Sequence, residues 1–587
     1  MRRLIKGISL LFVFFLVNFD VKAQPVFPGT VIYQSPDPLK VRAASPSIAI
    51  LPDGTYVVSH DMPKGSGIYR SEDKGKTWKF ITKVLVGHWA GLFVNEGSLY
   101  LMGISNSFGD IIIHKSNDGG YTWTASKDEN SGVIFKGKYH TAPVPVVVHK
   151  GRIWRAFEEI VDDSKHRDFH ALVISAPVGA DLLKASSWTR SNSIRFDETW
   201  INAKRPNWFE GNIVVTPNGD LVDFMRMDSW QGEKGNYSLE GSATGIPRNE
   251  VAAIISISND GKVVTFNNKP AEYVHFPGAE SKFTIRYDKV SGKYWTIVNK
   301  ISTFQNGLET YNGNWHQRNV LCLYSSKDLK NWEMQYKILR WNEGYQIKTW
   351  DVFGFQYADW LIEGDDIVAV SRTSWYGARY HDANMITFHR IENFRNKKVE
   401  DSPKDLLAIT KTKEIAYWSF DKNERTRPII VNKNLEVSEL VFGDGLTFVN
   451  GTKGLSFKAN KPTKSRTKAR ENNQYIQFQL HSQKNTKLSV TSLDYEIKEV
   501  TNDRSKKCKW SYSVDGGNNF VDITNYDFPI ESQADPKSVL YLSGLKDLQK
   551  ISADKAIIFR LYLWGGAVTD NQLATLSYIK VGGEVTQ

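Results

Sequence analysis

Residues 71–78 read SEDKGKTW and residues 116–123 read SNDGGYTW, two copies of one pattern, Ser-x-Asp-x-Gly-x-Thr-Trp. A shortened copy, SKDLKNW, follows at residues 326–332. In each copy the Asp side chain can accept hydrogen bonds from backbone N–H groups of the turn, while the Trp packs beneath it. The pattern therefore predicts a self-contained turn between two strands, with a structural rather than a catalytic role.

A second repeat surrounds these turns, because six times an apolar run meets a glycine-containing turn and then a second apolar run. The turns are Asp53-Gly54, Glu96-Gly97, Lys150-Gly151, Asn218-Gly219, Ser291-Gly292 and Gly364-Asp365. Such pairs are typical of β-hairpins. Successive glycines lie between 43 residues (Gly54 to Gly97) and 73 residues (Gly219 to Gly292) apart, which is the spacing of four-stranded blades. The sequence predicts an all-β chain with a six- or seven-bladed β-propeller, the seventh blade closing from residues 31–33.

The pattern changes after residue 398. Short alternating runs such as YIQFQL at 475–480 and AIIFRLYL at 556–563 are typical of a β-sandwich. We therefore expect a β-propeller, the catalytic domain, over residues 24–398, a linker over 399–413 and a β-sandwich accessory domain over 414–587. A chain of 587 residues is long enough for two hydrophobic cores.

The first 23 residues predict export. A basic start at residues 1–3, an apolar run from Leu10 to Val17 and a small-residue site ending at Ala23 form the pattern of a signal peptide that is cleaved near Ala23. No later segment is long and apolar enough to span a membrane. We expect a secreted protein, periplasmic or extracellular, without a membrane span.

The composition favours an anionic partner. The net charge of +11 raises the local concentration of anions, and no recognisable nucleic-acid module accompanies it. The 18 Trp and 25 Tyr can stack on sugar faces as well as fill β cores. We expect a monomer that binds an acidic polysaccharide or oligosaccharide and no nucleic acid.

The hairpins and the repeated turns together resemble the sialidase-like, or Asp-box, β-propeller superfamily over about residues 25–395. Four phrases, YHTAPVP (139–145), GRIWRA (151–156), SKFTIRYD (281–288) and FQYADW (355–360), are similar to secreted bacterial propeller lyases of the ulvan lyase and rhamnosyl-glucuronate lyase type. The C-terminal part resembles the jelly-roll modules of secreted polysaccharide-degrading enzymes. These resemblances imply a carbohydrate-active enzyme.

Residues at one register of successive blades converge around the channel of a propeller. A few residues past each turn glycine the sequence has His60, Arg155 with Glu158, Arg226, Asn299 and Arg372. Arginine binds carboxylate or sulfate with a bidentate fork, so the set predicts an anion-binding ring. The alternative is that these are ordinary charges at strand ends.

Cleavage by β-elimination at a uronate needs a group that neutralises the carboxylate, a base, and an acid for the leaving oxygen. The candidate catalytic residues are His140, Tyr139, His60, Arg226 and Tyr357. The candidate substrate-binding residues are Arg155, Arg205, Glu210, Arg286, Arg372 and Trp208. A lyase acting on an acidic glycan is the main functional expectation.

Two alternatives stay open. A sialidase-type exo-glycosidase would bind its substrate with three arginines and attack through a tyrosine, although its Arg-Ile-Pro phrase occurs only as residues 42–46, RAASP, and no acid/base Asp stands out in the early blades. A non-catalytic glycan-binding propeller would use aromatic residues for stacking, the candidates being Trp200, Trp208, Trp230 and Trp375.

No cofactor is expected. A structural zinc could use His316 and Cys322 with His381 or Asp382, but these residues form no ligand spacing motif. Calcium has no sequence motif either, so the sequence predicts no metal site.

Overall fold

The computed structural model describes residues 27–162, 168–197, 199–200, 207–228, 250–279, 281–300, 317–344, 351–407, 412–420, 426–450, 454–499, 505–524, 526–530, 537–566 and 572–587. The expected signal peptide, Arg205, Trp230 and His316 lie outside these residues. Within them almost every regular element is a β-strand, as predicted. No helix in these ranges combines the length and the apolar character needed to cross a bilayer.

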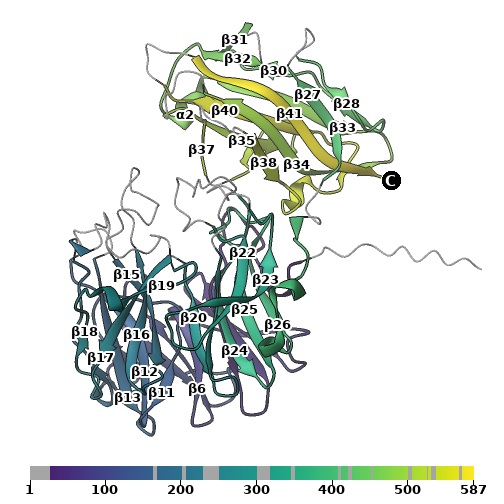
Figure 1. The fold of residues 1–587 in the computed structure, drawn as a ribbon. Coiled ribbons are helices and arrows are strands. Elements are labelled where there is room, and N and C mark those ends of the chain that lie inside the picture. The colour runs from purple at the N-terminus through teal and green to yellow at the C-terminus, as the bar shows by residue number, and fades with distance from the viewer. Residues whose placement is uncertain are drawn as a thin grey trace, which may run out of the picture.

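Six antiparallel sheets follow one another around a common axis as the blades of a propeller (Figure 1). Blades 1, 2 and 5 each contain four strands in sequence order. They are β2 (Ala44–Ile50), β3 (Tyr56–Met62), β4 (Gly65–Ser71) and β5 (Lys79–Val84); β6 (His88–Asn95), β7 (Ser98–Ile104), β8 (Ile111–Ser116) and β9 (Val133–Phe135); and β20 (Thr284–Asp288), β21 (Lys293–Asn299), β22 (Val320–Ser326) and β23 (Glu333–Arg340).

Blades 3 and 4 each divide one strand position between two short strands. Blade 3 contains β10 (Tyr139–His140) and β11 (Val147–His149), which both pair with β12 (Arg152–Ile160), followed by β13 (Phe169–Pro177) and β14 (Thr189–Arg190). Blade 4 contains β15 (Asn207–Val215), β16 (Leu221–Asp228) and β17 (Val251–Ile257), and β17 pairs with both β18 (Val264–Thr265) and β19 (Tyr273–His275).

Blade 6 combines the two ends of the propeller sequence. Its inner strands are β24 (Phe353–Glu363), β25 (Asp366–Trp375) and β26 (Met385–Ile391), and its outermost strand is β1 (Thr30–Gln34). Thr30 pairs with Phe388 and Gln34 with Met385. The N-terminal segment therefore completes blade 6 and closes the ring. Of the two predicted blade counts the described propeller has six, because residues 31–33 add a strand to blade 6 instead of forming a seventh blade.

The repeated Ser-x-Asp-x-Gly-x-Thr-Trp turns lie between the third and fourth strands of blades 1 and 2. Asp73 Oδ1 accepts a hydrogen bond from Thr77 N at 2.9 Å, and Trp78 Nε1 donates to Gly75 O at 3.2 Å. Asp118 repeats this arrangement in blade 2. Each turn is thus closed by its own side chains on the outer side of its blade.

Two further sheets begin at residue 414. The first contains β27 (Glu414–Ser419), β28 (Ile429–Ile430), β31 (Leu446–Asn450), β32 (Leu455–Ala459), β34 (Lys487–Lys498), β38 (Lys537–Tyr541), β39 (Ile551–Ser552) and β41 (Gln572–Thr586). The second contains β29 (Leu435–Val437), β30 (Val441–Phe442), β33 (Tyr475–Ser482), β35 (Lys507–Ser513), β36 (Val521–Asp522), β37 (Phe528–Pro529) and β40 (Ile557–Trp564). Trp418, Phe478 and Trp510 belong to one core that both sheets enclose, which is the arrangement of a β-sandwich.

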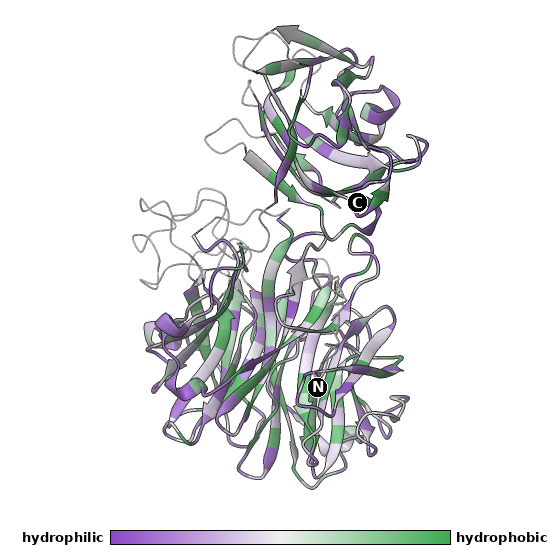
Figure 2. Cartoon of the chain, turned by 90° about the vertical axis from the view of Figure 1, so that its right-hand side faces the viewer, coloured by the Kyte–Doolittle hydropathy of each residue, from purple (hydrophilic) through white to green (hydrophobic). Residues whose placement is uncertain are grey.

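Hydrophobic and hydrophilic residues alternate along many strands of both domains (Figure 2). β33 is a clear case, because its exposure alternates at every residue from Tyr475 to Ser482. This alternation places one face of a strand in the core and the other toward water.

The two domains meet through aromatic side chains. The Tyr541 ring of β38 lies 5.7 Å from the Trp341 ring, 5.0 Å from the Phe353 ring and 6.4 Å from the Tyr376 ring, between centroids. The sandwich accordingly lies beyond the ends of β22 and β23 (Figure 1). Trp341, Phe353 and Tyr376 all follow or begin strands of blades 5 and 6, so the contact is to that side of the propeller.

The segment that leads into the sandwich is attached to blade 5. Ser402 Oγ accepts a hydrogen bond from Lys337 N at 3.0 Å, and Asp405 accepts from the backbone N–H groups of Asn342 and Glu343 at 2.7 and 2.8 Å. The predicted linker is therefore bound to the propeller over at least residues 402–405.

Candidate active site

The innermost strands of four blades are interrupted at the same level. Bulges occur in β2 between Ala44 and Ser47, in β6 between His88 and Gly91, in β15 between Phe209 and Asn212, and in β24 between Gln356 and Asp359. Within them φ is 50° at Ser45, 50° at Trp89, 50° at Glu210 and 53° at Tyr357. Non-glycine residues seldom adopt positive φ, and bulges redirect side chains. Repeated strain of this kind is a common feature of functional sites.

The second strand of each blade adds a side chain at this level. Asp61, Arg226 and Arg372 pair with Ala44, Phe209 and Gln356, where three of the interrupted stretches begin. Glu158 pairs with His140, the last residue of β10. Asn299, also expected in the ring, ends β21 in blade 5. Glu158, Arg226 and Arg372 of the predicted ring therefore lie at one level, whereas His60 and Arg155 do not join it.

Tyr357 lies among three arginines. The Cζ atoms of Arg372 and Arg318 are 5.2 and 5.5 Å from the centroid of its ring, and Arg226 interacts with its side chain. Burial lowers the pKa of Arg372, and the neighbouring charge of Arg318 adds to this shift. An anion bound between Arg318 and Arg372 would relieve the repulsion between them.

Main-chain carbonyls of the segment after β25 position two of these arginines, Arg372 directly and Arg318 through the Gln356 side chain. Arg372 Nη2 donates to His381 O at 2.7 Å. Arg318 donates to the Gln356 side-chain oxygen, and Gln356 Nε2 donates to Tyr380 O at 2.9 Å and to His381 O at 3.1 Å. Arg318, which directly precedes β22, was not among the candidates from the sequence, because nothing in its local pattern distinguishes it from other charges at strand ends.

Glu210 and Arg226 form a buried ion pair in blade 4. The Arg226 guanidinium donates to Glu210 Oε2, and the Glu210 side chain is only 4% exposed. Burial would raise the pKa of Glu210, but the positive charge of Arg226 outweighs it and holds the pKa below its usual value. Burial would likewise lower the pKa of Arg226, yet Glu210 and then Tyr357 raise it. Glu210 is therefore ionised, and Arg226 links it to Tyr357.

His140 forms a second buried pair, with Glu158. His140 Nδ1 lies 2.8 Å from Glu158 Oε2, and Glu158 Oε1 accepts a hydrogen bond from Gly211 N at 3.3 Å. The His140 ring stacks on Phe169 at 4.5 Å and meets the edge of Trp89 at 4.9 Å. Burial raises the pKa of Glu158. This pair is next to Glu210, because the charge of Glu210 raises the pKa of Glu158 further and that of His140 lowers the pKa of Glu210.

Asp61 joins the site although the sequence did not indicate it. Its Oδ1 accepts a hydrogen bond from Trp89 N at 2.9 Å, and among the described residues its buried Oδ2 has no hydrogen-bond partner. Burial raises the pKa of Asp61 to about 7, against the opposing effects of hydrogen bonds with Ser45 and with the Trp89 backbone and of the charge of Arg372. Arg372 thus neighbours both Asp61 and Tyr357. Asp61 follows the candidate His60 by one residue, and this one-residue shift moves a side chain to the other face of a strand.

Asp223 is a further buried carboxyl group beneath this level. It is 1% exposed, and neither side-chain oxygen has a hydrogen-bond partner among the described residues. Burial and the nearby Glu158 raise its pKa well above the usual value. Gly211 leaves room for it, because a Cβ at that position would lie 2.2 Å from Asp223 Oδ1. Asp223 therefore keeps its proton to a higher pH than an exposed aspartic acid does.

Buried cations continue deeper into the channel. Lys282 Nζ donates to Thr284 Oγ1 at 2.7 Å and to Ala358 O at 2.8 Å, and burial lowers its pKa to about 8. Arg155 is completely buried and donates to Met102 O at 2.7 Å, and burial lowers its pKa to about 9. Arg155 is thus bound to main-chain carbonyls below the arginine cluster.

Several residues singled out from the sequence lie elsewhere. His60 is buried between the rings of Tyr33 and Tyr69, at centroid distances of 4.4 and 5.4 Å, and burial lowers its pKa to about 4. The others are in hydrophobic cores away from the arginine cluster, namely Tyr139, Trp208, Trp200 and Trp375. Arg286 is bonded to Asp359 and to the backbone of Trp360.

Metal-binding groups do not gather in the part of the chain that the structure describes. No three or more His, Cys, Asp and Glu side chains there are arranged to hold an ion. Cys322 is buried in the core of blades 4 and 5, whereas His381 contacts Asp382 beside Arg372, with 3.0 Å between His381 Nδ1 and Asp382 Oδ1. The zinc hypothesis therefore has no support from the described residues.

No protein-family model and no curated protein sequence matches the chain. Solved structures with similar folds include the Penicillium chrysogenum α-L-arabinanase in complex with arabinobiose, at 16% identity and a TM-score of 0.39, over 64% of this chain and 100% of the arabinanase. An α-L-arabinofuranosidase of Fusarium graminearum, also in complex with arabinobiose, is 14% identical with a TM-score of 0.38. The match covers 62% of this chain and 98% of the arabinofuranosidase. A Hadza microbial sialidase is 16% identical with a TM-score of 0.39, and the match covers 62% of this chain and 68% of the sialidase.

These identities and scores are low, so the assignment of a six-bladed propeller rests on the strand pairing described above. The site, for its part, rests on the contacts at one end of the channel. There the chain brings together a tyrosine, three arginines and a carboxyl group whose pKa is close to neutral.

Proposed function

We propose that this protein is a glycoside hydrolase that releases an acidic sugar whose carboxylate is attached to the anomeric carbon. The observation that carries the proposal is the position of Tyr357 among Arg226, Arg318 and Arg372. Arg318 and Arg372 bind the substrate carboxylate, because paired guanidinium groups match the two oxygens. Tyr357 attacks the carbon that bears this carboxylate.

A tyrosine suits such a substrate better than an Asp or Glu. A carboxylate nucleophile would approach the substrate carboxylate with like charge, which costs several kcal/mol where the dielectric constant is low. A phenol avoids this repulsion, and tyrosine is a recognised exception among glycosidase nucleophiles. Arg226 interacts with both Glu210 and Tyr357, and in this proposal the ionised Glu210 accepts the phenol proton.

Asp61 supplies the acid. A general acid works best when its pKa is close to the working pH, and the pKa of Asp61 is about 7 because it is buried. In this proposal its buried Oδ2, which has no partner among the described residues, donates the proton to the leaving oxygen.

The reaction then has two balanced steps. In the first, the bond from the anomeric carbon to the leaving oxygen breaks, the Tyr357 oxygen bonds to that carbon, and Asp61 gives its proton to the leaving oxygen. In the second, water attacks the same carbon, Asp61 takes a proton from the water, and Tyr357 leaves and recovers its proton from Glu210.

β-Elimination at a uronate is a second candidate function. His140 favours it, because Glu158 holds its Nδ1 at 2.8 Å and thereby orients the ring for a base. Against this, Phe169 and Trp89 cover the ring. Export by the predicted signal peptide would suit either enzyme.

A substrate panel tests the proposal. The purified protein is incubated with sialyl-oligosaccharides, glucuronate-capped arabinogalactan, ulvan and neutral arabino-oligosaccharides, while free acidic sugar, reducing ends and near-ultraviolet absorbance are followed together. Release of an acidic sugar from the sialyl-oligosaccharides without new absorbance is the expected result. Absorbance that rises with the reducing ends would support the lyase instead, and release of neutral sugar alone would contradict an acidic substrate.

A further inference from the structure

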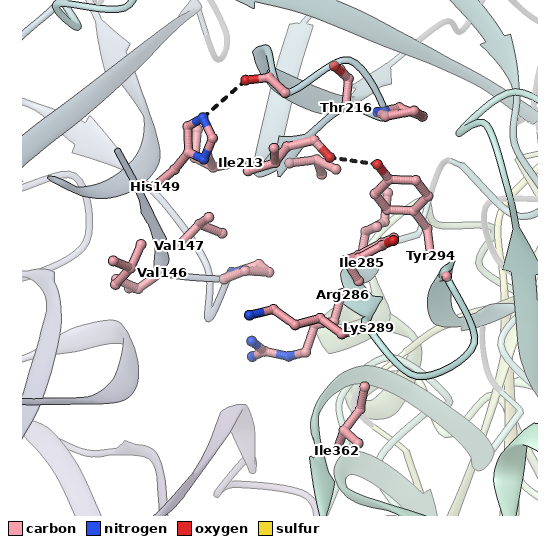
Figure 3. Close-up of a pocket in the computed structure, with 18 of the residues that line it drawn as sticks. Val146, Val147, His149, Ile213, Thr216, Ile285, Arg286, Lys289, Tyr294 and Ile362 are labelled. Carbon is pink, nitrogen blue, oxygen red and sulfur yellow. Dashed lines mark hydrogen bonds between the residues drawn. The ribbon is translucent and has the colours of Figure 1, made fainter. Parts of the chain in front are cut away.

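A hollow lies where the innermost strands of blades 3 to 6 enter their hairpin turns. This turn-side pocket has a volume of about 810 Å³ (Figure 3). Its walls come from β11, β15, β20, β24 and the turns that follow, with Val146, Val147, Ile213, Ile285 and Ile362 among the lining residues. A cavity of this size is within the range that holds small ligands, roughly 300–1,000 Å³.

The turn-side pocket is separate from the candidate active site. Ile213 follows Glu210 along β15, and Ile362 follows Tyr357 along β24, both toward the far end of the strand. Successive residues of a strand advance by about 3.3 Å, so the pocket is at the opposite end of the channel. None of the three arginines around Tyr357 lines it.

One side of the pocket is cationic. Arg286, Lys289 and Lys327 belong to its lining, which contains no Asp or Glu among the described residues. Figure 3 shows Arg286 and Lys289 extending side by side into the hollow. Arg286 donates through Nε to Trp360 O at 2.5 Å and through Nη2 to Asp359 Oδ1 at 3.3 Å. Its Nη1 and both lysine ammonium groups have no partner within the described ranges.

The facing side is aliphatic, because its polar groups are already bonded to the main chain. His149 Nε2 lies 3.1 Å from Gly219 O, and Tyr294 Oη donates to Val215 O at 2.7 Å (Figure 3). The surface left for a ligand is that of Val146 and Val147, together with the isoleucines. A concave site with charges of one sign concentrates oppositely charged ligands, and its aliphatic wall adds hydrophobic contact.

We propose that the turn-side pocket is a non-catalytic binding site for an acidic sugar unit. The sugar carboxylate would lie between Arg286, Lys289 and Lys327, with a C–H face of the ring on the aliphatic wall. The choice of an acidic sugar rests on the proposed function. Binding at a second site would keep the enzyme on a polymeric substrate, since a tethered second contact raises the effective concentration of the first.

Glucuronic acid is the probe, with glucose as its neutral counterpart. Binding is measured by ligand-detected nuclear magnetic resonance and by titration calorimetry on the full-length Arg372→Ala variant, in which the carboxylate site at the other end of the channel is disabled. In this background we expect glucuronic acid to bind and glucose to bind at least about fivefold more weakly. Adding Lys289→Ala and Lys327→Ala to this variant should weaken the binding of glucuronic acid about fivefold. Lys330→Ala, an exposed lysine outside the pocket, is the matched control and should change nothing.

Three results would overturn the proposal: no binding of glucuronic acid to the Arg372→Ala variant, equal binding of glucuronic acid and glucose, or unchanged binding after loss of the two lysines. Failure of this proposal and failure of the proposed function can be told apart. If the protein hydrolyses acidic glycosides but fails this binding test, only the proposal of a second binding site is wrong. If it passes the binding test but hydrolyses nothing, only the proposed enzymatic function is wrong.

Discussion

The guanidinium carbon of Arg372 lies 5.2 Å from the centre of the Tyr357 ring, and a 2.7 Å hydrogen bond from Nη2 to His381 O holds it there. The proposed nucleophile and the proposed carboxylate-binding group are therefore fixed in one place by backbone that belongs to the same blade. Burial and the charge of Arg318 lower the pKa of Arg372, as expected of a site that is completed by an anion.

Arg372→Lys should reduce kcat/KM for the acidic substrate by about 10- to 100-fold, because lysine retains the charge and loses the bidentate fork. The same variant should lose much less on a substrate whose carboxylate is converted to an amide. Steady-state kinetics on both substrates provide the measurement. Arg427→Lys, at an exposed ion pair in the sandwich, is the matched control. Equal losses on the two substrates would mean that Arg372 does not bind the carboxylate.

Asp61 should determine the alkaline side of the pH profile. Its pKa in the folded protein is about 7, and only the protonated form can serve as the acid. We expect kcat/KM for a poor leaving group to fall about tenfold per pH unit above about pH 7. Asp61→Asn should lower the rate by about 10²- to 10⁴-fold and remove this dependence. A variant that keeps the wild-type alkaline limb would assign it to another group.

Asp223 should make stability depend on pH. Because its pKa is raised in the folded protein, the folded state holds a proton that the unfolded state releases above its usual carboxyl pKa. The free energy of unfolding therefore falls as the pH rises above the usual carboxyl pKa of the unfolded state. Relative to wild type, Asp223→Asn should gain stability as the pH rises above about 4, as measured by urea unfolding at several pH values. A stability difference that is the same at every pH would show that Asp223 is not protonated in the fold.

The aromatic contact of Tyr541 with Phe353 should hold the domains together. Tyr541→Ala removes a ring 5.0 Å from that of Phe353 and should destabilise the contact by about 2 kcal/mol. We expect faster proteolysis between the domains and less cooperative thermal unfolding of the full chain. Tyr541→Phe retains the ring and should behave like wild type. If Tyr541→Ala behaves like Tyr541→Phe, the ring does not contribute.

The repeats made the propeller predictable, since each hairpin turn and each Asp-containing turn is local in sequence. The closure was not, because β1 pairs with β26, more than 350 residues away along the chain (Thr30 with Phe388). Local pattern cannot decide between a new blade and a strand added to an existing one.

The site was predictable in part for a related reason. Counting from the turn glycines located Arg226 and Arg372, which do lie beside Tyr357. It led to His60 instead of Asp61, since bulges and hairpins of unequal length shift the count by one residue and so reverse the face. Arg318 does not follow a hairpin turn at the counted distance, so counting could not locate it. It is positioned in the site by its hydrogen bond to the Gln356 side chain.

Covalent trapping tests the central claim most directly. A fluorinated analogue of the acidic sugar with a good leaving group forms the glycosyl-enzyme quickly and releases it slowly, so the attached sugar can be located by peptide mass spectrometry. We predict one sugar on the peptide that contains Tyr357, and none in Tyr357→Phe, whose turnover should fall by about 10³-fold or more while its fold is unchanged. A sugar attached to Glu210 or Asp61, or a Tyr357→Phe variant with near-normal turnover, would contradict the account.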